Sequence, residues 1–134
     1  GLDFDFFSGN QHTEGEPNDQ VSKANVLNLT TIMVANLSNG RDVDWFATNV
    51  EASGLLKIDF ESSSEVPLAW YLVEAYSGSL EDLLYLGGEW LYGKGHLSII
   101  KGNTPDLYVK ISMHDQFFES SIPYSLNINF EEGS

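Results

Sequence analysis

The sequence predicts an all-β protein that folds as a two-sheet antiparallel β-sandwich. From Thr30 onward, short runs rich in β-branched and aromatic residues are separated by Gly, Asn, Asp and Ser turns, about every 8 to 12 residues. No long amphipathic helix pattern accompanies them, and the stretch from Ser79 to Leu84 suits one helical turn at most. Short strands at this spacing pack most naturally as two facing sheets.

The residue pattern places each strand in order. Strands are expected at residues 31–37, 44–50, 55–61, 68–75, 83–86, 89–92, 96–100, 107–113 and 124–130. The turns between them are expected at Asn39-Gly40, Ser53-Gly54, Ser77-Gly78, Gly87-Gly88 and Lys101-Gly102-Asn103. Alternation along the strands then predicts the residues of the core, which are Leu56, Ile58, Phe60, Leu107, Val109, Ile111, Leu126 and Ile128, with Phe130 following.

Length and charge limit the classes of partner. A chain of 134 residues has the length of one domain and buries enough surface to fold without cross-links. Its 20 acidic and 6 basic residues give a formal charge of −14, which argues against nucleic acid and membranes as partners and favours cations. The absence of cysteine excludes a disulfide framework and Cys-ligated zinc. We expect a monomer.

The first twelve residues differ from the rest of the chain. Residues 1–12 are expected to form a leader or linker, or an added edge strand, because Leu2 to Phe7 alternates apolar and acidic residues. Residues 13–134 are expected to form the single sandwich domain. No signal peptide opens the chain and no apolar run approaches the ~18 residues of a transmembrane helix, so we expect a segment of a longer precursor.

Two acidic segments carry the residues best suited to bind a metal. The first runs from Thr13 to Asp19, and the second is Asp42-Val43-Asp44. Their hard oxygen donors are the ligands that Ca²⁺ prefers: Glu14, Glu16, Asn18, Asp19, Asp42 and Asp44. At the start of a strand, Asp42 and Asp44 would point to one face about 6.5 Å apart, by twice the strand rise, and a cation could bridge them.

The same residues also suit two solvated polar turns. Asn18 and Asp19 could cap a short helical turn over residues 20–25. Asp42 could serve a turn that follows Asn39-Gly40. Spacing alone leaves both interpretations open, because the two acidic segments are not local in sequence and do not form an EF-hand loop.

The order of these motifs resembles a known family. Glu-x-Glu-Pro-Asn-Asp, followed by Asp-Val-Asp-Trp-Phe, is similar to the bacterial pre-peptidase C-terminal (PPC) domain, which is related to the collagen-binding domains of clostridial collagenases. Residues 107–111 and 124–128 resemble the last two strands of that family, so the resemblance covers roughly residues 14–130. It implies a jelly-roll β-sandwich that secreted peptidases carry as an accessory domain.

The resemblance also implies a calcium site. In calcium-binding members, the acidic N-terminal linker folds onto the sandwich around the metal, and the six oxygen-bearing residues named above stand at the ligand motifs of the family. The sequence departs from the family pattern at two places. Ala35-Asn36-Leu37 replaces the usual Gly before that Leu, and Arg41 stands where a Gly or an acidic residue is common.

The search for catalytic residues yields little. His12, His96 and His114 are isolated, and no zinc-protease, serine-hydrolase or phosphate-loop motif is present. A few residues are near enough in sequence to imitate a triad or a carboxylate pair, but solvated loops and surface account for them: His114, Asp115, Ser120, Ser121, Glu81-Asp82 and Glu131-Glu132. We therefore expect a non-catalytic domain.

Aromatic residues are the better candidates for binding a ligand. Trp90 and Tyr92 share a face if residues 89–92 form a strand, and with Trp70 and Tyr71 they could stack on a sugar ring or grip a polypeptide. These rings could instead cap the core and cover sheet edges. In the collagen-binding relatives, tyrosines on the late strands contact the ligand, and Tyr108 resembles one of them. Lys110 and Ser112 occupy alternate positions where those relatives are often aromatic.

Together these observations predict a secreted, non-catalytic, calcium-binding accessory domain of a bacterial enzyme, expected to be a peptidase. The domain would position its parent catalytic domain on an extracellular polymer, a collagen-like protein in preference to a polysaccharide. Two alternatives remain open. One is a carbohydrate-binding module that uses the exposed aromatic residues, and the other is a structural or export segment removed during maturation.

Overall fold

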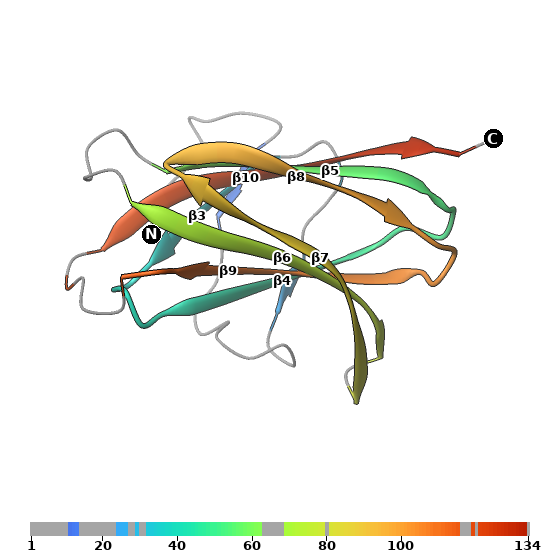
Figure 1. Ribbon diagram of the computed structural model, residues 1–134, viewed down its shortest axis with the longest axis horizontal. Coiled ribbons are helices and arrows are strands. Elements are labelled where there is room, and N and C mark those ends of the chain that lie inside the picture. The colour runs from blue at the N-terminus through green and yellow to red at the C-terminus, as the bar shows by residue number, and fades with distance from the viewer. Residues whose placement is uncertain are drawn as a thin grey trace.

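The computed structural model describes residues 11–13, 24–26, 29, 32–62, 69–79, 81–115, 119 and 121–133. Every regular element within these residues is a β-strand, and the strands form two sheets that lie face to face (Figure 1). The all-β, two-sheet sandwich predicted from the sequence is confirmed. In this described part of the chain, no helix has the length and apolar character needed to span a membrane.

Each sheet has five strands. Sheet A contains, in spatial order, β1 (Gln11–Thr13), β3 (Ile32–Leu37), β10 (Ile122–Glu132), β5 (Gly54–Ser62) and β8 (Lys94–Lys101). Sheet B contains β2 (Asn25–Val26), β4 (Val43–Asn49), β9 (Asp106–Met113), β6 (Trp70–Ser79) and β7 (Asp82–Tyr92). All pairs are antiparallel except those of the short strands β1 and β2, which lie parallel to β3 and β4. Gln11 and His12, from the expected leader, belong to β1.

The core lies between the two sheets and consists of inward-facing residues, which alternate with outward-facing ones along the strands. Of the nine predicted core residues, eight are buried and Phe130 is partly buried against them. Between the two sheets, the ring of Phe60 in sheet A packs against the ring of Tyr71 in sheet B, with the ring centroids 4.9 Å apart. The local alternation of the sequence therefore locates the core correctly.

The β6–β7 hairpin corrects two predictions. Gly87 and Gly88 do not form a turn, because the strands expected at 83–86 and 89–92 are one strand, β7, with a bulge opposite Ala75 and Tyr76. A Cβ on Gly88 would lie 2.5 Å from the Tyr85 hydroxyl oxygen, so the glycine makes room for that side chain. The turn expected at Ser77-Gly78 is also wrong, since β6 continues to Ser79 and β7 begins at Asp82.

Lys101 is an unusual member of the interior. It ends β8, is 1% exposed, and donates hydrogen bonds from Nζ to the carbonyl oxygens of Ala52 (3.0 Å) and Gly102 (2.7 Å). Burial lowers the pKa of this amine, because removal from water penalises its charged form. The side chain joins the connection before β5 to the connection after β8, at one end of the sandwich.

Candidate ligand-binding face and metal-binding segment

The outer face of sheet B collects the predicted ligand-binding residues. Because side chains alternate along a strand, Trp70 of β6 points away from the core while Tyr71 points into it. The strand register pairs Trp70 with Tyr92, and it pairs Leu72 with Trp90 on one side and with Ser112 on the other. We call this surface the aromatic face; its rings are Trp45, Trp70, Tyr76, Tyr85, Trp90, Tyr92 and Tyr108.

Four members of the aromatic face present about half of their surface to solvent. Trp70 and Trp90 are each 48% exposed, Tyr92 is 51% exposed and Tyr85 is 55% exposed. The Trp70 and Tyr92 rings contact each other with their centroids 5.1 Å apart. The Trp90 and His114 rings meet edge to face, with their centroids 5.6 Å apart. These contacts hold the rings in place and leave apolar surface accessible to a ligand.

Trp45 and Tyr76 are among the more enclosed rings of the aromatic face. Tyr76 lies 5.4 Å from both the Trp45 and Tyr85 rings, measured between centroids. Burial raises the pKa of Tyr76 to about 12, and the neighbouring Glu74 carboxylate adds to this effect. Burial also raises the pKa of Tyr108, with a smaller contribution from Asp106. These phenols are therefore neutral hydrogen-bond donors at physiological pH.

Sequence reasoning named four of these rings and missed three. Trp45, Tyr76 and Tyr85 belong to the same face but were not identified. For Tyr76 the signal was available, because it follows Trp70 at an even spacing along one strand. The position of Trp45 depends on the pairing of β4 with β9, which places it beside Lys110, whose Nζ lies 5.6 Å from the Trp45 ring centroid.

A depression of about 450 Å³ adjoins the Trp90 end of the aromatic face. Apolar side chains of Val43 and Leu72 line it together with Trp90, and polar groups reach it from Arg41 and Lys110. The Lys110 Nζ also lies 3.9 Å from Glu74 Oε1. The depression thus combines apolar walls with two cationic side chains.

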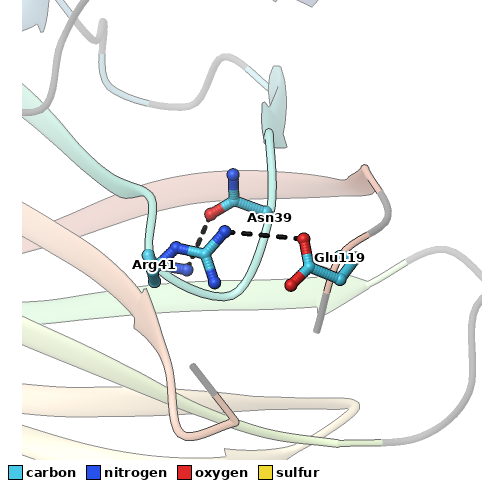
Figure 2. A network of polar contacts seen from close by, with 3 residues as sticks. All are labelled: Asn39, Arg41 and Glu119. Carbon is cyan, nitrogen blue, oxygen red and sulfur yellow. Dashed lines mark hydrogen bonds and ion pairs between the residues drawn. The ribbon is translucent and has the colours of Figure 1, made fainter. Parts of the chain in front are cut away.

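The turn before β4 organises the second acidic segment, and it confirms the turn predicted at Asn39-Gly40. The Asp42 carboxylate accepts hydrogen bonds from the backbone amides of Ser38 (2.8 Å) and Val43 (2.9 Å). The Asn39 side chain accepts one from the Arg41 amide at 2.8 Å, and the Arg41 guanidinium pairs with Glu119 at 3.5 Å (Figure 2). Asp42 therefore caps this turn, as one of the two interpretations proposed, while its other lone pairs remain available to a metal.

Asp44 occupies a different environment. It is fully buried within β4, opposite Ile111, and it faces sheet A. The Tyr124 hydroxyl donates a 2.6 Å hydrogen bond to Asp44 Oδ2 across the sandwich. This bond orients a carboxylate in an apolar interior, where an ionised group needs strong partners.

The other four predicted metal ligands lie outside the described residues: Glu14, Glu16, Asn18 and Asp19. Within the described residues, no three His, Asp or Glu side chains are grouped so as to hold a metal ion. The calcium site stays a prediction.

The residues considered for catalysis are spread over several elements of the two sheets. His96 is in β8 of sheet A, whereas His114 directly follows β9 of sheet B. The Ser121 hydroxyl lies 2.6 Å from Asn36 Oδ1 and donates to it, and Ser120 is outside the described residues. Glu81, Asp82, Glu131 and Glu132 are all exposed.

Comparison with known proteins finds similarity in the fold and not in the sequence. No family model and no curated protein matches the chain. Among solved structures, the pre-peptidase C-terminal domain of the collagenase from Bacillus anthracis is similar, with a TM-score of 0.51 and 16% identity over 87% of this chain and 100% of that chain.

Two further structures share the architecture. CorA, a surface-associated copper-binding protein of Methylomicrobium album BG8, has a TM-score of 0.67 and 4% identity over 81% of this chain and 98% of its own. PliG of Aeromonas hydrophila, a periplasmic inhibitor of g-type lysozyme, has a TM-score of 0.60 and 8% identity over 81% and 96%. At these identities the likeness concerns the fold, and the chain has the β-sandwich fold seen in a pre-peptidase C-terminal domain, as its acidic motifs indicated.

Proposed function

We propose that this chain is a non-catalytic accessory domain of a secreted bacterial enzyme, a peptidase, and that it binds this enzyme to a polymeric, collagen-like protein through the aromatic face. The observation that carries the proposal is the group of Trp70, Trp90 and Tyr92, which are about half exposed on one face and held by contacts with neighbouring rings. Trp and Tyr are the side chains that most often dominate binding energy at protein interfaces.

The chemistry of the face favours a polypeptide. Tyrosine hydroxyls and the Lys110–Glu74 pair lie among the rings, so the surface offers hydrogen bonds and charges as well as apolar area. The likeness to a domain of a collagenase supports a fibrous protein as the polymer. The surface-associated and periplasmic fold neighbours support export of this chain.

A polysaccharide is the second candidate. The observation that favours it is the Trp70–Tyr92 pair, two adjacent exposed rings with centroids 5.1 Å apart. Rings arranged in this way can stack on the apolar faces of sugar units.

We further propose that Ca²⁺ joins the acidic N-terminal segment to the sandwich through Glu14, Glu16, Asn18, Asp19, Asp42 and Asp44. The donor chemistry of these residues supports this, and so do the hydrogen bonds that orient the carboxylates of Asp42 and Asp44. Calcium would offset the mutual repulsion of the carboxylates and order the segment toward the parent enzyme. Binding at roughly a hundred-fold excess over Kd would stabilise the fold by about 2.7 kcal/mol.

Co-sedimentation with insoluble polymers tests the proposed binding face. The protein is mixed with collagen fibrils, with gelatin beads, and with cellulose and chitin, each with and without calcium. We expect retention on collagen or gelatin, and we expect Trp90→Ala and Tyr92→Ala to lose most of it, because each removes exposed aromatic area.

Ile100→Ala is the control for this experiment. Ile100 is 82% exposed on β8 of sheet A, so the substitution removes a larger exposed apolar fraction from the other sheet. Retention on cellulose or chitin alone, lost in the same two variants, would instead establish the carbohydrate-binding function. If all three variants bind every polymer as the wild type does, the aromatic face is not the binding site.

A further inference from the structure

The depression beside Trp90 concentrates positive charge in an acidic chain. The protein has 20 acidic and only 6 basic residues, yet Arg41 and Lys110 both line this one depression. They come from different parts of the fold, since Arg41 lies in the turn before β4 and Lys110 lies in β9. The imidazole of His114 adds a further polar group beside Trp90.

Two carboxylates that pair with these cations, those of Glu119 and Glu74, do not line the depression. Arg41 pairs with Glu119 at 3.5 Å, and both side chains are largely exposed, at 53% and 75%. Exposed pairs of this kind are weak, and an incoming anion can replace the carboxylate. The Lys110–Glu74 distance of 3.9 Å leaves Lys110 able to reach a second acceptor.

Asp42 is an acidic residue on the lining, and the backbone offsets its charge. Its two oxygens accept hydrogen bonds from the Ser38 and Val43 amides, so the carboxylate is directed toward its own turn. Val43, Leu72 and Trp90 add apolar walls to the same depression. This arrangement suits a side chain with a methylene stem and an anionic head.

We propose that this depression binds an acidic side chain, a glutamate or aspartate of the polypeptide that the aromatic face holds. The stem would pack against Trp90, and the carboxylate would pair with Arg41 and Lys110. The guanidinium of Arg41 can bind a carboxylate through two parallel hydrogen bonds. The inference rests on the proposed function and names the part of the polymer that is recognised.

Paired soluble peptides test it on the intact chain. Peptides of Gly-Pro-Glu repeats and of Gly-Pro-Gln repeats, equal in length, differ only in carboxylate against carboxamide. Isothermal titration calorimetry should show about tenfold tighter binding of the Glu peptide. Arg41→Gln and Lys110→Gln should each reduce its affinity toward that of the Gln peptide and weaken the dependence on salt.

Lys57→Gln is the matched control. Lys57 is a partly exposed cation 3.9 Å from a carboxylate, Asp59, but it lies on sheet A. Its removal should leave the preference for the Glu peptide unchanged. An equal loss in Lys57→Gln would show a general effect of net charge and would overturn the proposal.

Two other results separate this inference from the proposed function. If both peptides bind equally while Trp90→Ala still abolishes retention on gelatin, the acidic subsite is wrong and the binding face stands. If neither peptide binds and Trp90→Ala changes nothing on gelatin, both fail. Preferential binding of an acidic polysaccharide such as alginate, with no peptide binding, would also overturn the acidic-peptide subsite.

Discussion

The contact between Tyr124 and Asp44 predicts a measurable loss of stability when one hydroxyl group is removed. The Tyr124 hydroxyl donates to the Asp44 carboxylate at 2.6 Å. The two residues are 3% and 0% exposed, so water cannot replace the lost donor without rearrangement. Because removing one partner of a buried hydrogen bond costs about 1 to 3 kcal/mol, we expect Tyr124→Phe to lower the free energy of unfolding by about 2 kcal/mol.

Tyr71→Phe is a matched control for this variant. Both tyrosines are buried against the same ring, with centroids 4.9 Å (Tyr71) and 5.2 Å (Tyr124) from that of Phe60. Within the described structure, the Tyr71 hydroxyl is buried without a hydrogen-bond partner, and the neighbouring Ser62 hydroxyl donates to the Gly93 carbonyl at 3.0 Å. Its removal should leave stability nearly unchanged or raise it, because no bond is lost and a buried polar group disappears.

Urea unfolding, followed by circular dichroism in EDTA, measures both variants without a contribution from metal. Tyr124→Phe should move the midpoint to lower urea with an unchanged m value, while Tyr71→Phe should match or exceed the wild type. If Tyr124→Phe is as stable as the wild type, or if both variants lose the same amount, the buried carboxylate does not depend on this hydroxyl.

Three further predictions follow from the same structure. Gly54→Ala should lower the free energy of unfolding by about 1 to 3 kcal/mol, because its Cβ would clash with the Glu131 carbonyl oxygen. Gly102→Ala should be neutral, because its Cβ would meet no described neighbour within 4 Å. Urea unfolding compares the two variants. Burial holds the pKa of Lys101 below 10.5, so protonation of this amine opposes folding. The contribution of Lys101 to the free energy of unfolding should therefore rise with pH between the lowered pKa and 10.5. Lys101→Met should lack that rise when the free energies of unfolding of variant and wild type are compared at neutral and at alkaline pH. Millimolar Ca²⁺ should raise the melting temperature of the wild type by several degrees relative to EDTA. Asp44→Ala should abolish this gain, while Asp82→Ala, at an exposed position, should keep it. Superimposable wild-type melting curves with and without Ca²⁺ would reject the calcium site.

The fold class and the core were predictable because they depend on local patterns. A period of two along β5 places Leu56, Ile58 and Phe60 on one face whatever the strand pairs with. The continuation of β7 through Gly87 and Gly88 was not predictable in the same way. A glycine pair suits a turn and equally suits a strand that passes close to bulky neighbours. Here both glycines lie within β7, and the Tyr85 hydroxyl lies close to Gly88.

For the candidate site, the sequence by itself determined that Trp90 and Tyr92 share one face and that the oxygen-rich segments suit a hard cation. Only the tertiary structure decided that Trp70, Tyr108 and Trp45 lie on that same face, because this depends on the register of β6, β7, β9 and β4. Only the tertiary structure also showed that Asp42 and Asp44 have different environments. Asp42 lies at a turn, whereas Asp44 accepts a hydrogen bond from Tyr124, a residue 80 positions away. Alternation is a property of one strand, whereas a site that spans several strands depends on which strands pair and how the two sheets face each other.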